Sequence, residues 1–143
     1  MYVMMKKIIL LFVVFLPVWA SAQADRKLDA EGNLLYQYQR TVSEPCDTCK
    51  ELTVTLLFVN GNHPAAISLR QEAFDTQVRW IDIAGGTAGH EEVVEFVTAN
   101  LEPNQTITWS YAVSAKKGKV SAPEKAALLI MDEKYGVEKI WLK

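Results

Sequence analysis

The sequence predicts an all-β fold, a single sandwich of about seven or eight short antiparallel strands that follows a cleaved signal peptide. Three observations predict it. Apolar and polar residues alternate in several short segments, turn residues separate these segments at spacings of about 8–12 residues, and no segment keeps the periodicity of an amphipathic helix. The 143-residue chain leaves about 120 residues after the signal, which suffices for one domain with one core.

Residues 1–22 have the three parts of a secretory signal peptide. Lys6 and Lys7 form a positive start, an apolar run follows over residues 8–16, and the small residues 20–22 suit the pocket of a signal peptidase. The apolar run is much shorter than the roughly 20 residues that a helix needs to cross a membrane. We therefore predict cleavage before Gln23, with no membrane span after cleavage and a secreted or periplasmic location.

The remaining domain, residues 23–143, is acidic overall. Removing the signal takes away two of the 15 Lys and Arg and none of the 17 Asp and Glu, which leaves 13 against 17 and a net charge of about −4. Nucleic-acid binding needs a clustered cationic surface, and the longest basic cluster, Lys116 to Lys119, is typical of a solvated loop. We expect no nucleic acid as a partner and a protein or envelope component of unknown identity instead.

The first two predicted strands lie before the strongest turn signal. One covers Leu34 to Val42, after an acidic, glycine-containing turn, and the next covers residues 51–59, where every second residue is apolar. Because successive side chains of a strand point to opposite faces, this alternation describes a sheet with one buried surface. Asn60-Gly61-Asn62 then predicts a tight turn, since Asn-Gly accepts the left-handed backbone that hairpins require.

Three weaker strand patterns follow, over Ala65 to Arg70, Thr76 to Ile83 and Glu92 to Ala99. The clearest pattern covers Thr106 to Val113, where one face is large and apolar and the other is small and polar. Between the second and third weak patterns, Gly85 to His90 lacks the Gly-Lys-Ser/Thr ending and the helix of a phosphate-binding loop. We predict that it is a connection between strands.

The chain ends in a predicted hairpin. Ala126 to Met131 and Val137 to Leu142 flank a five-residue connection, residues 132–136, whose glycine can take a positive φ. A helix beginning at Pro123 competes for the first of these segments, because the residues after it have good helix propensity. The tight turn and the β-rich partner segment favour a strand.

One stretch resembles a known family. Leu101-Glu102-Pro103 precedes the aromatic-rich segment 107–113, and Ala115 to Pro123 follows as a polar, glycine-containing loop. In this order, Val97 to Ala127 resembles the second half of a fibronectin type III domain, within the immunoglobulin-like group. The resemblance implies an immunoglobulin-like sandwich and no particular function, since such sandwiches serve adhesion, ligand binding, chaperoning and spacing.

Cys46 and Cys49 form the one constellation with reactive chemistry. In an exported protein an even pair of cysteines is normally oxidised, so we predict a local disulfide between them. The four-residue loop limits its stabilisation to about 2 kcal/mol before strain. Thiol–disulfide exchange with Cys46 as nucleophile is the alternative, but a predicted strand follows the pair and the acidic residues around it raise the thiol pKa.

Other catalytic chemistry has little support in the sequence. Haem attachment would require His after Cys49, where the chain has Lys50, and His63 and His90 are not in zinc-ligand spacing. No Gly-x-Ser-x-Gly element occurs, and two histidines give no pattern of a Ser-His-Asp triad. We expect no metal, no cofactor and no enzyme.

The aromatic residues leave one more alternative open. They could form a stacking platform for sugar rings, but their alternation with Val and Ile is typical of a core: Tyr36, Tyr38, Trp80, Trp109, Tyr111 and Trp141. The sequence thus predicts an exported, non-enzymatic β-sandwich that acts as a binding or structural module. The alternatives are a thiol–disulfide redox domain that uses Cys46 and Cys49, and a small carbohydrate-binding module.

Overall fold

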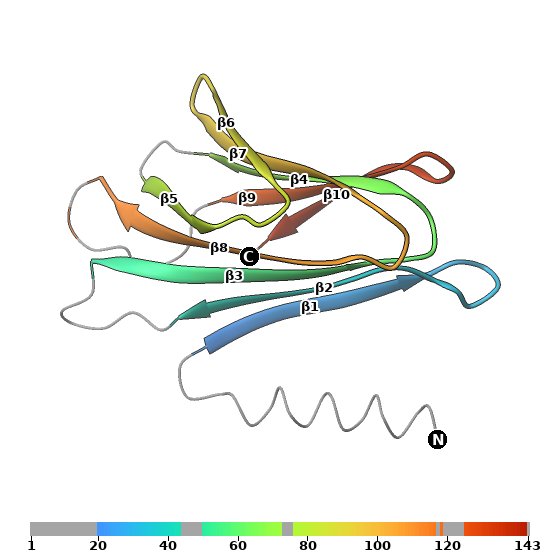
Figure 1. Cartoon of the computed structure of the whole chain (residues 1–143). Coiled ribbons are helices and arrows are strands. Elements are labelled where there is room, and N and C mark those ends of the chain that lie inside the picture. Colours follow the sequence, from blue (N-terminus) through green and yellow to red (C-terminus); the bar gives the residue numbers. More distant parts are fainter. Residues whose placement is uncertain (1–19, 44–49, 73–75, 117, 119–124, 143) are drawn as a thin grey trace.

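The computed structural model describes residues 20–43, 50–72, 76–116, 118 and 125–142. These residues form two antiparallel sheets of five strands each that share one core in a sandwich-like arrangement, and none of them is helical (Figure 1). Within the described ranges, no helix is long and apolar enough to cross a membrane.

The three N-terminal strands lie in one sheet and the two C-terminal strands in the other. The first sheet has the neighbour order β1-β2-β3-β8-β5, with β1 (Ala20–Leu28), β2 (Leu34–Ser43), β3 (Glu51–Asn60), β8 (Thr106–Ala115) and β5 (Thr76–Asp82). The second sheet has the order β10-β9-β4-β7-β6, with β10 (Gly136–Leu142), β9 (Ala126–Asp132), β4 (Ala65–Glu72), β7 (Val94–Leu101) and β6 (Thr87–Glu91). The strands β1, β5, β10 and β6 are therefore the edges.

The core forms where the alternating apolar residues of both sheets face each other. Trp109, Tyr111 and Val113 of β8 are fully buried, as are Ile67 and Leu69 of β4 in the facing sheet. The outer face of β8 carries only Thr, Ser and Ala, and that of β3 begins with Glu and Thr but ends in the half-buried Leu57 and Val59, as the period of two requires. The predicted one-sided burial of these two strands is confirmed.

All eight predicted strands are present, and the last two form the predicted hairpin from Gly136 to Leu142 against Ala126 to Asp132. The segment that competed as a helix is the strand β9. The expected strand count of seven or eight was too low, because β1 and β6 were missed. In β1, Asp25 and Lys27 lie on the inner side of the sheet, opposite Tyr38 and Tyr36, so neither side of this strand is apolar.

The strand β6 was predicted to be a connection because of its glycines. A Cβ atom on Gly89 would lie 2.4 Å from the ring of Phe96, the residue opposite it on β7. Gly89 therefore makes room for an aromatic side chain across the pair, which is a recognised use of glycine within a strand. Only the beginning of the predicted connection is a turn, with the Gly86 N–H donating to the Ile83 carbonyl at 2.7 Å.

The turn at Asn60-Gly61-Asn62 has a different role from the predicted hairpin. It carries the chain from β3 in one sheet to β4 in the other, and Gly61 does not have a positive φ. A Cβ atom on Gly61 would lie 2.1 Å from the Leu34 carbonyl oxygen, so close backbone approach requires glycine here. The buried Asn60 side chain donates to the carbonyls of His63 and Glu102 at 2.8 and 2.9 Å, which holds this crossing together.

The predicted cleavage point falls within β1. Ala20, Ser21 and Ala22 pair with the last residues of β2, whereas the pairing from Gln23 onward continues to Leu28. Cleavage before Gln23 stays a prediction. If it occurs, the mature β1 begins at Gln23 and the end of β2 lies at an edge.

Candidate functional site

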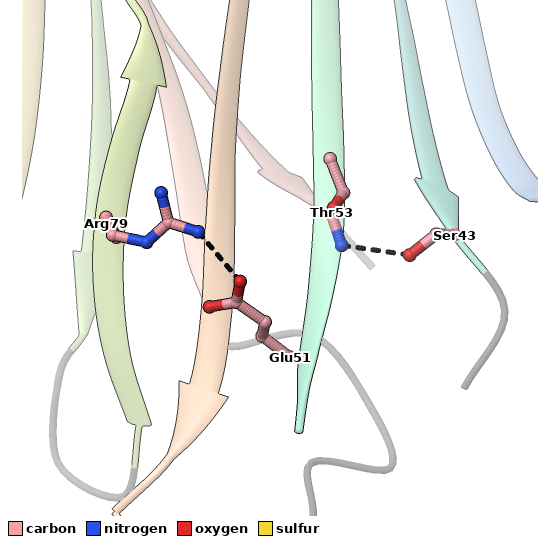
Figure 2. A network of polar contacts seen from close by, with 4 residues as sticks. All are labelled: Ser43, Glu51, Thr53 and Arg79. Carbon is pink, nitrogen blue, oxygen red and sulfur yellow. Dashed lines mark hydrogen bonds and ion pairs between the residues drawn. The ribbon is translucent and has the colours of Figure 1, made fainter. Parts of the chain in front are cut away.

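The predicted disulfide partners, Cys46 and Cys49, lie outside the described residues. The strand ends on either side of them are described and are joined by polar contacts (Figure 2). The Ser43 hydroxyl at the end of β2 accepts a hydrogen bond from the Thr53 N–H of β3 at 2.9 Å. The disulfide and its redox alternative both stay predictions.

An ion pair next to this loop was not expected from the sequence. Arg79 of β5 and Glu51 of β3 form it across the intervening strand β8, with 2.7 Å between guanidinium nitrogen and carboxylate oxygen (Figure 2). Both side chains are well exposed, so the pair contributes little to stability. It nevertheless offsets one of the negative charges that were expected to surround the cysteines.

The aromatic residues are mostly core, as predicted, with one exception. Trp109 and Tyr111 are fully buried, and Trp80 is half-buried with its ring edge-on to Tyr111 at 5.5 Å between centroids. Trp141 on β10 is 53 % exposed, so its assignment to the core was wrong. The rings of Trp80, Trp109 and Trp141 therefore do not line up on one exposed face.

The side chains around His90 on β6 form polar contacts with β7 and β4. His90 on β6 faces Glu95 on β7, with 2.9 Å between Nδ1 and the carboxylate, and both groups are partly exposed. Arg70 on β4 lies 3.4 Å from Glu91 in the same hairpin. Among the described residues, no group of three or more His, Cys, Asp or Glu side chains is arranged to hold a metal ion.

A surface that the sequence did not single out lies on the outer side of β10 and its neighbours. Along β10, Glu138, Ile140 and Leu142 point inward, whereas Val137, Lys139 and Trp141 point outward. By register, these outward residues stand beside the half-buried Met131 and Leu129 and the small Ala127 of β9, with Ala66 of β4 next to Met131. We call this surface the β10 face; its members are Val137, Lys139, Trp141, Leu129, Met131, Ala127 and Ala66.

The β10 face is apolar and partly open to solvent. Val137 is 69 % exposed, and the Lys139 ammonium lies 4.2 Å from the centre of the Trp141 ring. A groove of about 440 Å³ runs along its end, lined by Ala66 and Met131 together with Pro64, Asn100 and Glu133. A strand whose two alternating sides both carry apolar residues, Val137 and Trp141 on one and Ile140 and Leu142 on the other, is the signal that could have pointed to this surface.

The same strand has an open backbone edge. The Trp141 carbonyl accepts a hydrogen bond from the Gln23 side chain of β1 at 3.3 Å, so this carbonyl points away from β9. Because the N–H and C=O of one residue point to the same side and alternate along a strand, Val137 and Lys139 also direct their backbone groups to this edge. The outward side chains and the open backbone groups thus belong to the same three residues.

Side chains of β1 fill the space between β1 and the edge of β10, which we call the seam. Lys27 pairs with Glu138 at 3.1 Å, and the Gln23 amide also donates to the Tyr38 hydroxyl at 3.2 Å. Burial raises the pKa of the Tyr36 hydroxyl well above its usual value, and a hydrogen bond to Glu138 raises it further. A cavity of about 200 Å³, lined by Tyr36, Leu35 and Val137 among others, opens at the end of this seam.

Comparisons with known proteins assign no family. No protein-family model and no curated protein matches the chain. Similar solved structures include the GAE domain of yeast GGA1, at 11 % identity and a TM-score of 0.44 over 74 % of this chain and 91 % of that one. The chitin-binding domain of Chi18aC from Streptomyces coelicolor has 10 % identity and a TM-score of 0.39, covering 76 % and 90 %. The apo PCuAC domain of PmoF2 has 14 % identity and a TM-score of 0.36, covering 83 % and 91 %. Scores at this level indicate neither a family nor a function.

Proposed function

We propose that this chain is an exported, non-enzymatic β-sandwich module that binds an apolar, extended segment of a partner protein on the β10 face. The observation that carries the proposal is the exposure of Val137 and Trp141 on the same face of the second sheet as the half-buried Leu129 and Met131. Apolar side chains gathered on one face are typical of protein interaction sites, and Trp often contributes most of the binding energy there. Export rests on the signal features of residues 1–22.

The composition of the face favours a protein segment over a sugar. Sugar platforms use several exposed aromatic rings, whereas Trp141 is the single aromatic member of the β10 face and lies opposite Ala127. Aliphatic side chains contact other apolar side chains and offer no ring for stacking. The groove beside Met131 gives room for one side chain of the partner segment.

We also infer that the module is immunoglobulin-like. The neighbour orders β2-β3-β8-β5 and β10-β9-β4-β7 parallel the A-B-E-D and G-F-C-C′ orders of that group. The chain order differs, because β5 in the D position precedes β7 in the C′ position. In this correspondence the aromatic-rich β8 takes the place of strand E and two strands follow it, whereas the fibronectin type III resemblance implies one last strand after the aromatic-rich segment and its polar loop. This supports the wider group more than the fibronectin type III family.

A site-specific photo-cross-linker tests the proposed function. Placed at Val137 in the full chain expressed in its native host, it should give a discrete cross-linked product with one protein. The same cross-linker at Thr108, which is exposed on the outer face of the opposite sheet, should give none. The purified partner should then bind the wild-type protein and lose affinity for a Trp141→Ala variant by about tenfold or more, as for an interface Trp.

The proposal fails if Val137 gives no product, if Thr108 gives the same product, or if Trp141→Ala binds the purified partner as the wild type does. Because Trp141 is half-exposed, the variant should keep the wild-type fold, which its circular dichroism spectrum would verify.

A further inference from the structure

We infer that the partner segment adds to the second sheet as a further strand beside β10 and places a carboxylate opposite Lys139, between two apolar residues. This inference rests on the proposed function and specifies the chemistry of the partner. It follows from three features of β10: its open backbone edge, its regular register, and the charge at its centre.

The four sheet edges differ in how well they could accept another strand. The register of β1 shifts at Lys27 and Leu28, and that of β5 shifts between Trp80 and Asp82. The strand β6 is only five residues long. By contrast, β10 pairs without interruption over seven residues. Bulges and short length are devices that protect sheet edges from strand addition, and β10 has neither; its protection is charge, which a strand with an acidic residue opposite Lys139 would neutralise.

The backbone of β10 has groups to offer to a new strand. The contact from Gln23 shows that the Trp141 carbonyl points to the open side, and the alternation of backbone groups along a strand implies the same for Val137 and Lys139. At 3.3 Å that contact is long for an N–H···O hydrogen bond, whose usual length is about 2.9 Å. A backbone N–H from an added strand can therefore replace the Gln23 side chain with better geometry.

The charge at the centre of β10 selects among possible strands. Within the part of the chain that the structure describes, Lys139 contacts the Trp141 ring and pairs with no carboxylate. A second copy of β10, paired antiparallel over its full length, would put Lys139 opposite itself, and like charges directly opposite are destabilising. A foreign strand with Glu or Asp at this place forms an ion pair instead.

The side chains on either side of Lys139 set the rest of the pattern. Val137 and Trp141 lie two residues before and after it on the same face, so an added strand meets them with residues two positions from its carboxylate. On the other side, the added strand lies near the polar side chains that β1 directs to the seam. The expected partner pattern is apolar, polar, acidic, polar, apolar, and it reads the same in either strand direction.

A short synthetic peptide tests this inference on the purified wild-type protein. The probe is an acetylated, amidated peptide of seven residues with valine at the second and sixth positions, glutamate at the fourth and threonine elsewhere. Hydrogen exchange followed by NMR should show that the amides of Val137, Lys139 and Trp141 become protected when it binds. A matching peptide with lysine in place of glutamate should bind about fivefold more weakly, the range expected for an exposed ion pair and its like-charge counterpart.

A charge exchange provides the control. Lys139→Glu should reverse the preference, so that the lysine peptide binds better than the glutamate peptide. Lys134→Glu changes an exposed cation in the neighbouring turn and should leave the preference unchanged. The inference is overturned if no peptide binds, if the three amides stay unprotected, if Lys134→Glu acts like Lys139→Glu, or if sedimentation shows a dimer built through β10. The cross-linking test at Val137 does not depend on these results, so a failure of this inference can be distinguished from a failure of the proposed function.

Discussion

Replacing the buried amide of Gln71 with an apolar side chain should stabilise the protein. Gln71 on β4 is fully buried, and among the described residues neither its Nε2 nor its Oε1 has a hydrogen-bond partner. A buried polar group without a partner costs about 1–3 kcal/mol. Methionine has nearly the same length and volume without the amide, so Gln71→Met should increase the free energy of unfolding by about 1–3 kcal/mol.

Asn60 provides the matched contrast, because its buried amide is bonded. Its Nδ2 donates to two backbone carbonyls, and an Asn60→Leu variant would leave both carbonyls without this donor. We expect this change to decrease the free energy of unfolding by about 2–4 kcal/mol, because each of the two carbonyls left without a donor contributes separately. Two buried amides in one core should thus respond to apolar replacement with opposite signs.

Urea denaturation, followed by circular dichroism, measures both changes from the transition midpoint at a constant slope m. For a variant with a different m, the midpoint does not measure the change in stability alone, since the compactness of its denatured or native state has changed. If Gln71→Met lowers the stability by more than about 1 kcal/mol, the amide makes a favourable interaction in solution and the reasoning from its burial is wrong.

Three further predictions follow from the same structure. Gly61→Ala should lower the free energy of unfolding by about 3 kcal/mol, because the new Cβ atom meets backbone atoms. Gly32→Ala should lower it by about 1 kcal/mol, because the space there is open and only the φ of +87° is unfavourable. Equal urea midpoints for the two variants would contradict this. The raised pKa of Tyr36 favours its protonated form in the folded state, so this stabilisation is present below pH of about 10 and is lost as the pH rises towards the folded-state pKa. Tyr36→Phe should therefore flatten the fall in urea midpoint above pH of about 10, and an unchanged slope would refute the assignment. The double variant Cys46→Ser/Cys49→Ser should keep its fold and lose no more than about 2 kcal/mol, and outright unfolding at room temperature would show that the pair does more than tie down one loop.

Most strands that were predicted from the sequence have one buried face, and the edge strand β5 has one half-buried face. Each central strand meets the core on one side, and the alternation that burial imposes is visible in segments such as Leu52 to Phe58. The missed strands are edges. In β1 the inner side carries Asp25 and Lys27 in the seam, and in β6 Gly89 serves the ring of Phe96, so neither strand carries an apolar alternation of its own.

The candidate site was harder to predict because no single segment contains it. The strand Val137 to Leu142 was expected, but which of its two mixed faces is buried depends on where the core lies. Its outward residues form a surface only together with Leu129 and Met131 of β9. The strand β10 is an edge because β9 pairs on its other side with β4, a strand some 60 residues earlier in the chain. Local alternation cannot specify pairing over such distances.

The two sides of β10 have different roles in the fold and at the surface. On the inner side, Glu138 is neutralised by Lys27, and Leu142 is buried, so the strand is held firmly in its own sheet. On the outer side, Lys139 separates Val137 from Trp141 and opposes a second copy of the same strand. The positive charge that discourages self-association is the same one that would admit an acidic partner strand. Specificity against the wrong partner and affinity for the right one can therefore reside in a single side chain.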